Sequence, residues 1–208
     1  YFRLYDTDQD RPVRREQDND GSNDCASATC TYPSLTTAAV GTLSVDIVDS
    51  GGSSVTSPSV TFGAKTFSFE TQTSTGTLGT SSQKVRVSNT TSTPNWTLSI
   101  AATTGPTTLW TTGSITYDFN GSAANGRLTV NAAGGTITPQ GGCATTGLTL
   151  GSSTAFAQGT QDSVDLLTAG GSAQTSCYWD VTNVSLTQDI PATQANGTYT
   201  ISMTITVS

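Results

Sequence analysis

The sequence predicts an all-β fold, an antiparallel β-sandwich of the Greek-key or jelly-roll kind with an extended N-terminal arm. Three observations predict it. Ser and Thr are abundant and strong helix formers are scarce, and the branched Cβ of Thr suits a pleated strand. Short alternating apolar runs are separated by clusters of Gly, Pro, Asn and Ser, as in sandwiches and barrels. Charge is concentrated near the start of the chain, which separates an arm from a nearly neutral body.

The uneven charge divides the 208-residue chain into two parts. Residues 1–34 form a charged arm that contains a small loop between Cys25 and Cys30, and residues 35–208 form the β-sandwich domain. The boundary is placed at Pro33 and Ser34 because the sequence is almost neutral from Tyr32 onward. The chain starts without a recognisable signal peptide, as expected of a processed secreted protein.

Alternation of apolar and polar residues identifies the strands of the sandwich. The clearest run is 199–207, in which every second residue is apolar and the residues between carry hydroxyl groups, the pattern of a half-buried strand. Shorter runs predict further strands at residues 43–47, 85–87, 96–100, 115–119, 128–130 and 148–150. Residues 161–168 are the only candidate helix, of one or two turns.

Four cysteines permit three pairings. The local pairing, Cys25 with Cys30 and Cys143 with Cys177, is the simplest. Because the chain has no His and no C-x-x-C motif, two disulfides formed in an oxidising compartment are expected in place of a zinc site. The bridge between Cys143 and Cys177 would stabilise the fold by roughly 3 to 4 kcal/mol in the chain-entropy model.

The absence of His also removes the commonest general base and excludes Ser-His-Asp and Cys-His nucleophiles. A carboxylate pair would suffice for glycoside hydrolysis, but nothing in the sequence groups the candidates Asp118, Asp162, Asp165 and Asp180. We therefore expect a non-enzymatic protein without a cofactor. The net charge of −7 makes nucleic acid a poor partner, and no apolar run approaches the roughly 20 residues that span a bilayer.

Two groups of motifs resemble the WxL-type domains of bacterial cell surfaces, over about residues 40–208. The first group is Val60-Thr61-Phe62-Gly63, the run at 84–89 and Asn95-Trp96-Thr97-Leu98; the second is Ile190-Pro191-Ala192 and Gly197-Thr198-Tyr199-Thr200. The resemblance implies a β-sandwich and non-covalent attachment to peptidoglycan, with Trp96 and Leu98 as the signature. Ile205-Thr206-Val207 replaces the second Trp-x-Leu of that family. The ending is also similar to extracellular pilus and biofilm-fibre subunits of the TasA type.

Three other groups of residues are candidate sites. Alternating carboxylates at Asp6, Asp8, Asp10, Asp18 and Asp20 resemble parts of a calcium loop, but neither run completes an EF-hand, so a solvated acidic arm is the favoured alternative. Sequons for glycosylation occur at Asn89, Asn95, Asn120, Asn183 and Asn196. Trp96, Trp110 and Trp179 would form either a carbohydrate platform or core; the phase of Trp96 with Leu98 favours core, and Trp110 fits both equally.

The arm begins with an apolar, β-prone segment that contains Tyr1, Phe2, Leu4 and Tyr5. Some thirty extended residues reach roughly 100 Å, enough to add a strand to the sheet edge of a neighbouring subunit; the alternative is an arm folded back on its own domain. The sequence thus predicts a secreted structural subunit of an extracellular, pilus-like filament or surface layer. The alternative is a WxL-like adhesin or cell-wall-binding protein.

Overall fold

The computed structural model describes residues 41–208, and this part of the chain confirms the predicted all-β antiparallel sandwich. It contains no α-helix, only a 3-10 turn, η1 (Ala132–Gly134). The strands are β1 (Leu43–Val48), β2 (Gln72–Leu78), β3 (Lys84–Asn89), β4 (Trp96–Ala102), β5 (Leu109–Thr111), β6 (Thr116–Asp118), β7 (Arg127–Asn131), β8 (Thr136–Pro139), β9 (Leu148–Leu150), β10 (Ser153–Ala155), β11 (Ser163–Ala169), β12 (Cys177–Thr182), β13 (Val184–Ile190) and β14 (Met203–Val207).

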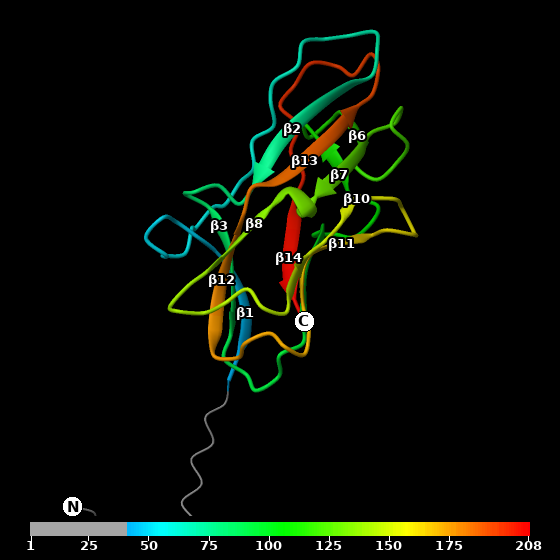
Figure 1. The fold of residues 1–208 in the computed structure, drawn as a ribbon. Coiled ribbons are helices and arrows are strands. Elements are labelled where there is room, and N and C mark those ends of the chain that lie inside the picture. The colour runs from blue at the N-terminus through cyan, green and yellow to red at the C-terminus, as the bar shows by residue number, and fades with distance from the viewer. Residues whose placement is uncertain (1–40) are drawn as a thin grey trace, which may run out of the picture. The chain divides into compact units, whose positions relative to one another are not determined.

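The strands form three four-stranded sheets and one small hairpin (Figure 1). The sheet orders are β1-β3-β12-β8, β10-β7-β13-β2 and β14-β4-β11-β9, and the hairpin is β5-β6. The first two sheets are linked because β12 continues into β13 with only Asn183 between them. Asn183 adopts a left-handed conformation with φ of 61°, and its N–H donates to the Gly79 carbonyl at 2.8 Å. Asn tolerates this conformation better than most residues, so it suits the bend between the two sheets.

One hydrophobic core draws side chains from all three four-stranded sheets, and part of it lies where β12 faces β4. Trp179 of β12 and Trp96 of β4 meet there with their ring centroids 5.7 Å apart, and Trp179 is fully buried. Its indole Nε1 donates to the Ala144 carbonyl at 2.8 Å. Trp179 thus buries its ring and keeps its indole hydrogen bond, whereas Trp96 Nε1 is buried without a partner among the described residues. The contact between the two rings joins β12 to β4.

The outer face of β12 carries an ion network around Asp180, whose side chain is almost fully buried. Arg86 Nε and Lys84 Nζ lie 2.7 and 3.1 Å from its two carboxylate oxygens. Burial by itself would raise the pKa of Asp180, but the hydrogen bonds from Arg86 and Lys84 outweigh it and hold the pKa below its usual value. The Arg86 guanidinium also lies 5.0 Å from the centre of the Tyr178 ring. The network joins β3 to β12 outside the core.

The predicted strands are found at β1, β3, β4, β6, β7, β9 and β14. The candidate helix at 161–168 is wrong, because Ser163–Ala169 is strand β11. Its pairing with β4 shifts register between Asp165 and Leu167, which buries Leu166 and Leu167 in succession. Such a bulge breaks the period of two, so the apolar residues fall at spacings that imitate a helix.

The predicted disulfide between Cys143 and Cys177 is confirmed. It joins the loop after β8 to the first residue of β12, with 5.9 Å between the Cα atoms. A disulfide is compatible with a protein that matures in an oxidising compartment. Cys25, Cys30 and the boundary near Pro33 and Ser34 lie outside the described residues.

Candidate functional site

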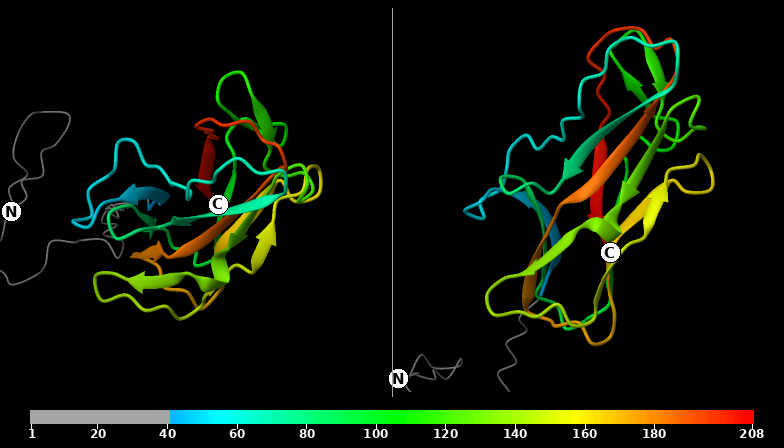
Figure 2. Two further views of the ribbon diagram at one scale, coloured as in Figure 1. Left: turned by 90° about the horizontal axis from the view of Figure 1, so that it is seen from above. Right: turned by 45° about the horizontal axis from the view of Figure 1, so that its top comes forward.

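A groove lies between β1 and β14, the end strands of two different sheets. The two strands are neighbours in space, yet no ladder joins them within residues 41–208. Both can be followed as separate strands, blue and red, in the two views of Figure 2. The groove has a volume of about 590 Å³. Its apolar lining includes Val45 and Ile47 from β1, Met203 and Ile205 from β14, and Ile201 just before β14.

These lining side chains are only half-buried, although they pack against the main core. Every second residue of β1 and β14 is therefore apolar without being fully covered. In a closed β-sandwich the opposite sheet normally covers the inner face of an edge strand and shields it from solvent. Here the two edges leave an apolar trough that additional chain would close.

The segment before β2 forms one wall of the groove. Gly63 donates its N–H to the Thr75 carbonyl at 3.0 Å and accepts a hydrogen bond from Ser74 Oγ at 2.5 Å, which holds the segment against β2. Val60 lies so close to Gly76 that a Cβ at position 76 would stand 2.8 Å from a Val60 methyl carbon. Gly76 therefore permits the close approach that brings Val60 and Phe62 to the groove.

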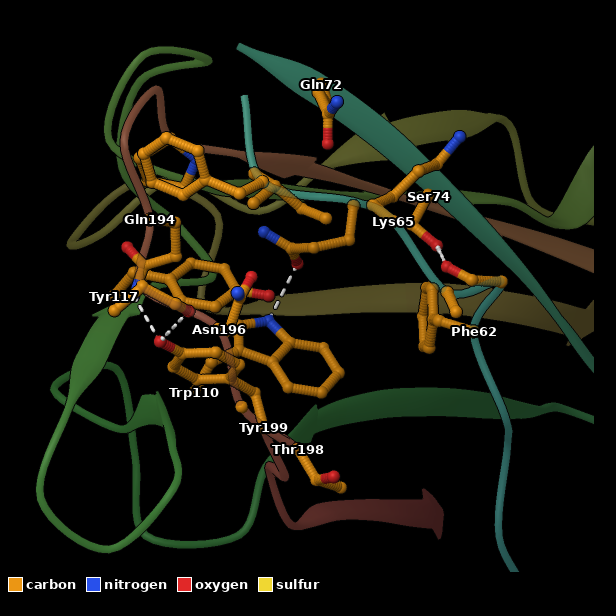
Figure 3. Close-up of a pocket in the computed structure, with 18 of the residues that line it drawn as sticks. Phe62, Lys65, Gln72, Ser74, Trp110, Tyr117, Gln194, Asn196, Thr198 and Tyr199 are labelled. Atoms are coloured by element: carbon orange, nitrogen blue, oxygen red, sulfur yellow. Dashed lines mark hydrogen bonds between the residues drawn. The ribbon is translucent and has the colours of Figure 1, made fainter. Parts of the chain in front are cut away.

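The groove is continuous with an aromatic pocket of about 430 Å³, since Phe62, Trp110 and Tyr199 line both. Figure 3 shows the rings of Trp110, Tyr117 and Tyr199 gathered on one side of this pocket and Phe62 across from them. Phe62 meets Trp110 edge-on at 5.5 Å, and Tyr117 meets Tyr199 at 5.1 Å between centroids. Edge-to-face pairs of this kind stabilise one another by about 0.5 to 1.5 kcal/mol, so the wall is preformed.

The indole N–H of Trp110 and the hydroxyl of Tyr199 in this aromatic wall are already bonded within the protein. Trp110 Nε1 donates to Gln188 Oε1 at 2.8 Å, and the Tyr199 hydroxyl donates to the Ala195 carbonyl at 2.8 Å. Gln188 is itself buried on β13. Because these groups are satisfied, the rings offer mainly apolar surface. Lys65 is the only charged residue among those that line the pocket, so the site suits an apolar or aromatic side chain.

Burial raises the pKa of Tyr117 to about 12, with a smaller contribution from Tyr199. A raised pKa in the folded state means that folding favours the neutral phenol. We expect the stability that this group contributes to be complete below pH 10, its ordinary pKa, and to be lost as the pH rises toward 12. Urea unfolding at pH 9 to 12 checks this, with Tyr117→Phe as the control; an equal alkaline loss in that variant would assign the effect to other groups.

The WxL-like signature residues lie in the core. Trp96 is 3% exposed and Leu98 is fully buried, as the phase of strand β4 predicts. Trp110, which the sequence left open between core and carbohydrate platform, is 8% exposed and forms the wall of the aromatic pocket. Neither tryptophan presents a free ring face on the outer surface, because both are buried.

Two of the five sequons have structural roles. Asn89 is 0% exposed: its Nδ2 donates to the Thr93 carbonyl at 2.9 Å, and its Oδ1 accepts from the Thr91 N–H. Asn120 is 3% exposed and donates to the Pro106 carbonyl at 2.8 Å. A glycan has no room at either side chain in the folded protein. The exposed sequon residues are Asn95, Asn183 and Asn196.

The remaining candidate residues are those of the arm and four aspartates of the domain. Tyr1, Phe2, Leu4, Tyr5 and the aspartates at 6, 8, 10, 18 and 20 lie outside the described residues. Within residues 41–208 no three His, Cys, Asp or Glu side chains cluster as metal ligands, so Asp118, Asp162, Asp165 and Asp180 belong to no such cluster. The same part of the chain holds no helix long and apolar enough to cross a membrane.

Sequence reasoning missed the groove itself. Its signal was present, since the runs at 43–47 and 199–207 each carry an apolar face, but periodicity does not tell which strands become edges. No family model, curated protein or solved structure matched the chain.

Proposed function

We propose that this protein is a non-enzymatic structural subunit of an extracellular filament or surface layer, in which a strand from the arm of one subunit occupies the groove of the next. The observation that carries the proposal is the apolar groove between β1 and β14, two strands that each end a sheet. An added strand would cover apolar surface and also pair free backbone groups, the two requirements of β-strand addition.

The arm has the composition that such a groove requires. Tyr1-Phe2-Arg3-Leu4-Tyr5 is apolar and β-prone, and it alternates so that Phe2 and Leu4 fall on one face. The acidic residues begin only at Asp6, so five residues can enter the groove without burying a carboxylate. Forty residues precede the described domain, which is length enough to reach a second subunit.

A donor arm and an acceptor groove on the same chain make a heterologous contact. Such contacts generate open filaments when the rotation between subunits does not close into a ring. The alternative, in which the arm fills the groove of its own domain, would produce a monomer from the same residues. The two arrangements differ in size and in concentration dependence.

Cell-wall binding through the Trp96 and Leu98 signature receives no support from the geometry. Both side chains are buried, so neither is available to a glycan strand. An exposed aromatic pair does exist at Phe67 and Phe69, with ring centroids 5.2 Å apart, but it lies outside the signature. A pull-down on purified peptidoglycan separates the two functions, because a filament subunit need not bind that polymer.

Deletion of residues 1–31 tests the proposal. We expect the full chain to form filaments or sheets in electron micrographs and the truncated chain to remain monomeric in light scattering, with unchanged circular dichroism. The double variant Asp18→Asn, Asp20→Asn, which changes the arm outside its apolar segment, should assemble normally. Assembly of the truncated chain to the same extent as the full chain would contradict the proposal.

A further inference from the structure

The two edges of the groove are not equally free, as the hydrogen bonds of β14 and β1 show. Ser208 and Thr97 exchange both backbone hydrogen bonds, at 2.8 and 3.0 Å, and Thr103 N–H donates to the Ser202 carbonyl at 3.0 Å. In an antiparallel ladder the bonded residues alternate. The even-numbered residues of this strand therefore bond to β4, and the backbone groups of the odd-numbered residues point toward the groove.

Three odd-numbered residues line the groove: Ile201, Met203 and Ile205. Thr200, just before them, exchanges both backbone bonds with Thr111, which is consistent with the same alternation. No residue of 41–208 accepts from or donates to the backbone of these three residues. The segment from Ile201 to Ile205 thus offers three N–H and three carbonyl groups along the groove.

The edge of β1 is shorter. The Thr90 N–H donates to the Thr42 carbonyl at 2.8 Å, so even-numbered residues of this strand face β3. Ile47 faces the other way, but its carbonyl already accepts from the Val55 N–H at 2.8 Å. The turn after β1 folds back along the same edge, because Asp49 N–H donates to the Ser53 carbonyl at 2.9 Å. Within residues 41–208 this edge leaves unpaired both backbone groups of Leu43 and Val45 and the N–H of Ile47.

We infer that the donated strand hydrogen-bonds to β14, across Ile201 to Ile205, and that β1 contributes side chains but no ladder. This inference rests on the proposed function. The donated strand is the segment Tyr1 to Tyr5 of a second copy, which has the same length as the edge from Ile201 to Ile205. Phe2 and Leu4 would face the trough between Met203 and Val45. The aromatic pocket continues the same trough beyond Ile201.

Hydrogen exchange on the full chain tests the inference without a mutation. Amides of Ile201, Met203 and Ile205 should exchange at least tenfold more slowly in assembled protein than in dilute monomer. The amides of Thr204 and Thr206, which face β4 in both states, should change little. Protection at Leu43 and Val45 in place of Ile201, Met203 and Ile205 would overturn the inference, as would assembly that leaves the amides of all five of these residues unprotected.

A matched pair of proline variants supplies the second test. Met203→Pro removes an N–H that faces the groove, and Val45→Pro does the same on β1; both positions are on edge strands, where proline is tolerated. We expect Met203→Pro to raise the critical concentration for assembly roughly fivefold to tenfold, the value of one hydrogen bond. Val45→Pro should leave it within a factor of two, and the reverse order would contradict the assignment.

These outcomes are separable from failure of the proposed function. If the full chain assembles only through its arm but the protection falls on β1, the filament function stands and the choice of edge is wrong. If deletion of residues 1–31 leaves assembly unchanged, the filament mechanism itself is wrong. Circular dichroism of both proline variants shows whether each retains its fold, and the exchange measurement on the unmodified chain decides the case if one does not.

Discussion

Replacement of Trp179 by Ala should lower the free energy of unfolding by about 3 to 5 kcal/mol. Trp179 is fully buried between the two facing sheets, and its ring lies 5.7 Å from that of Trp96. Truncation removes this contact, opens a cavity and leaves the Ala144 carbonyl without its indole donor. Urea denaturation monitored by far-ultraviolet circular dichroism measures the loss.

The neighbouring residue supplies the control for that experiment. Tyr178 lies on the opposite face of β12 and is 37% exposed, so Tyr178→Phe should change the free energy of unfolding by less than about 0.5 kcal/mol. A loss below about 1 kcal/mol for Trp179→Ala would show that the two sheets do not depend on this contact.

Loss of the Cys143–Cys177 disulfide should cost about 4 kcal/mol. The bridge closes a loop between cysteines 34 residues apart, and the chain-entropy model gives this value for a loop of that length. The double variant Cys143→Ala, Cys177→Ala should unfold at lower urea concentration than the parent in oxidising buffer.

A reducing agent provides the matched comparison. It should lower the stability of the parent domain toward that of the double variant and leave the variant itself unchanged. If the reductant destabilised the double variant equally, the effect would belong to another part of the chain. If the variant were as stable as the oxidised parent, the bridge would not constrain the unfolded chain.

The strands that the sequence predicts well are those with one apolar face. Residues 199–207 alternate without interruption, and β14 follows within that run. β2 was not predicted, because Gln72–Leu78 carries a single large apolar side chain, Leu78. Its place in the sheet comes from the ladder with β13, which extends from Leu78 to Gln72. Non-local pairing of this kind leaves no periodic signal in the strand itself.

The candidate site was predictable only in its parts. The apolar faces of β1 and β14 can be identified in the sequence, and so can the apolar segment at the start of the arm. Their relation depends on which strands end a sheet, and that is decided by pairings such as β1 with β3 and β14 with β4. The aromatic pocket likewise joins Phe62, Trp110 and Tyr199 from distant segments, which no spacing rule connects.

The antiparallel ladders beside the groove have a mechanical consequence for an assembled filament. β1 pairs with β3 over six residues, and β14 pairs with β4 over five. Tension applied along the arm would enter the domain at the start of β1, and tension from a strand seated in the groove would enter at β14. A force directed along β1 or β14 would load the hydrogen bonds of its ladder together in shear, so that these bonds resist the force collectively.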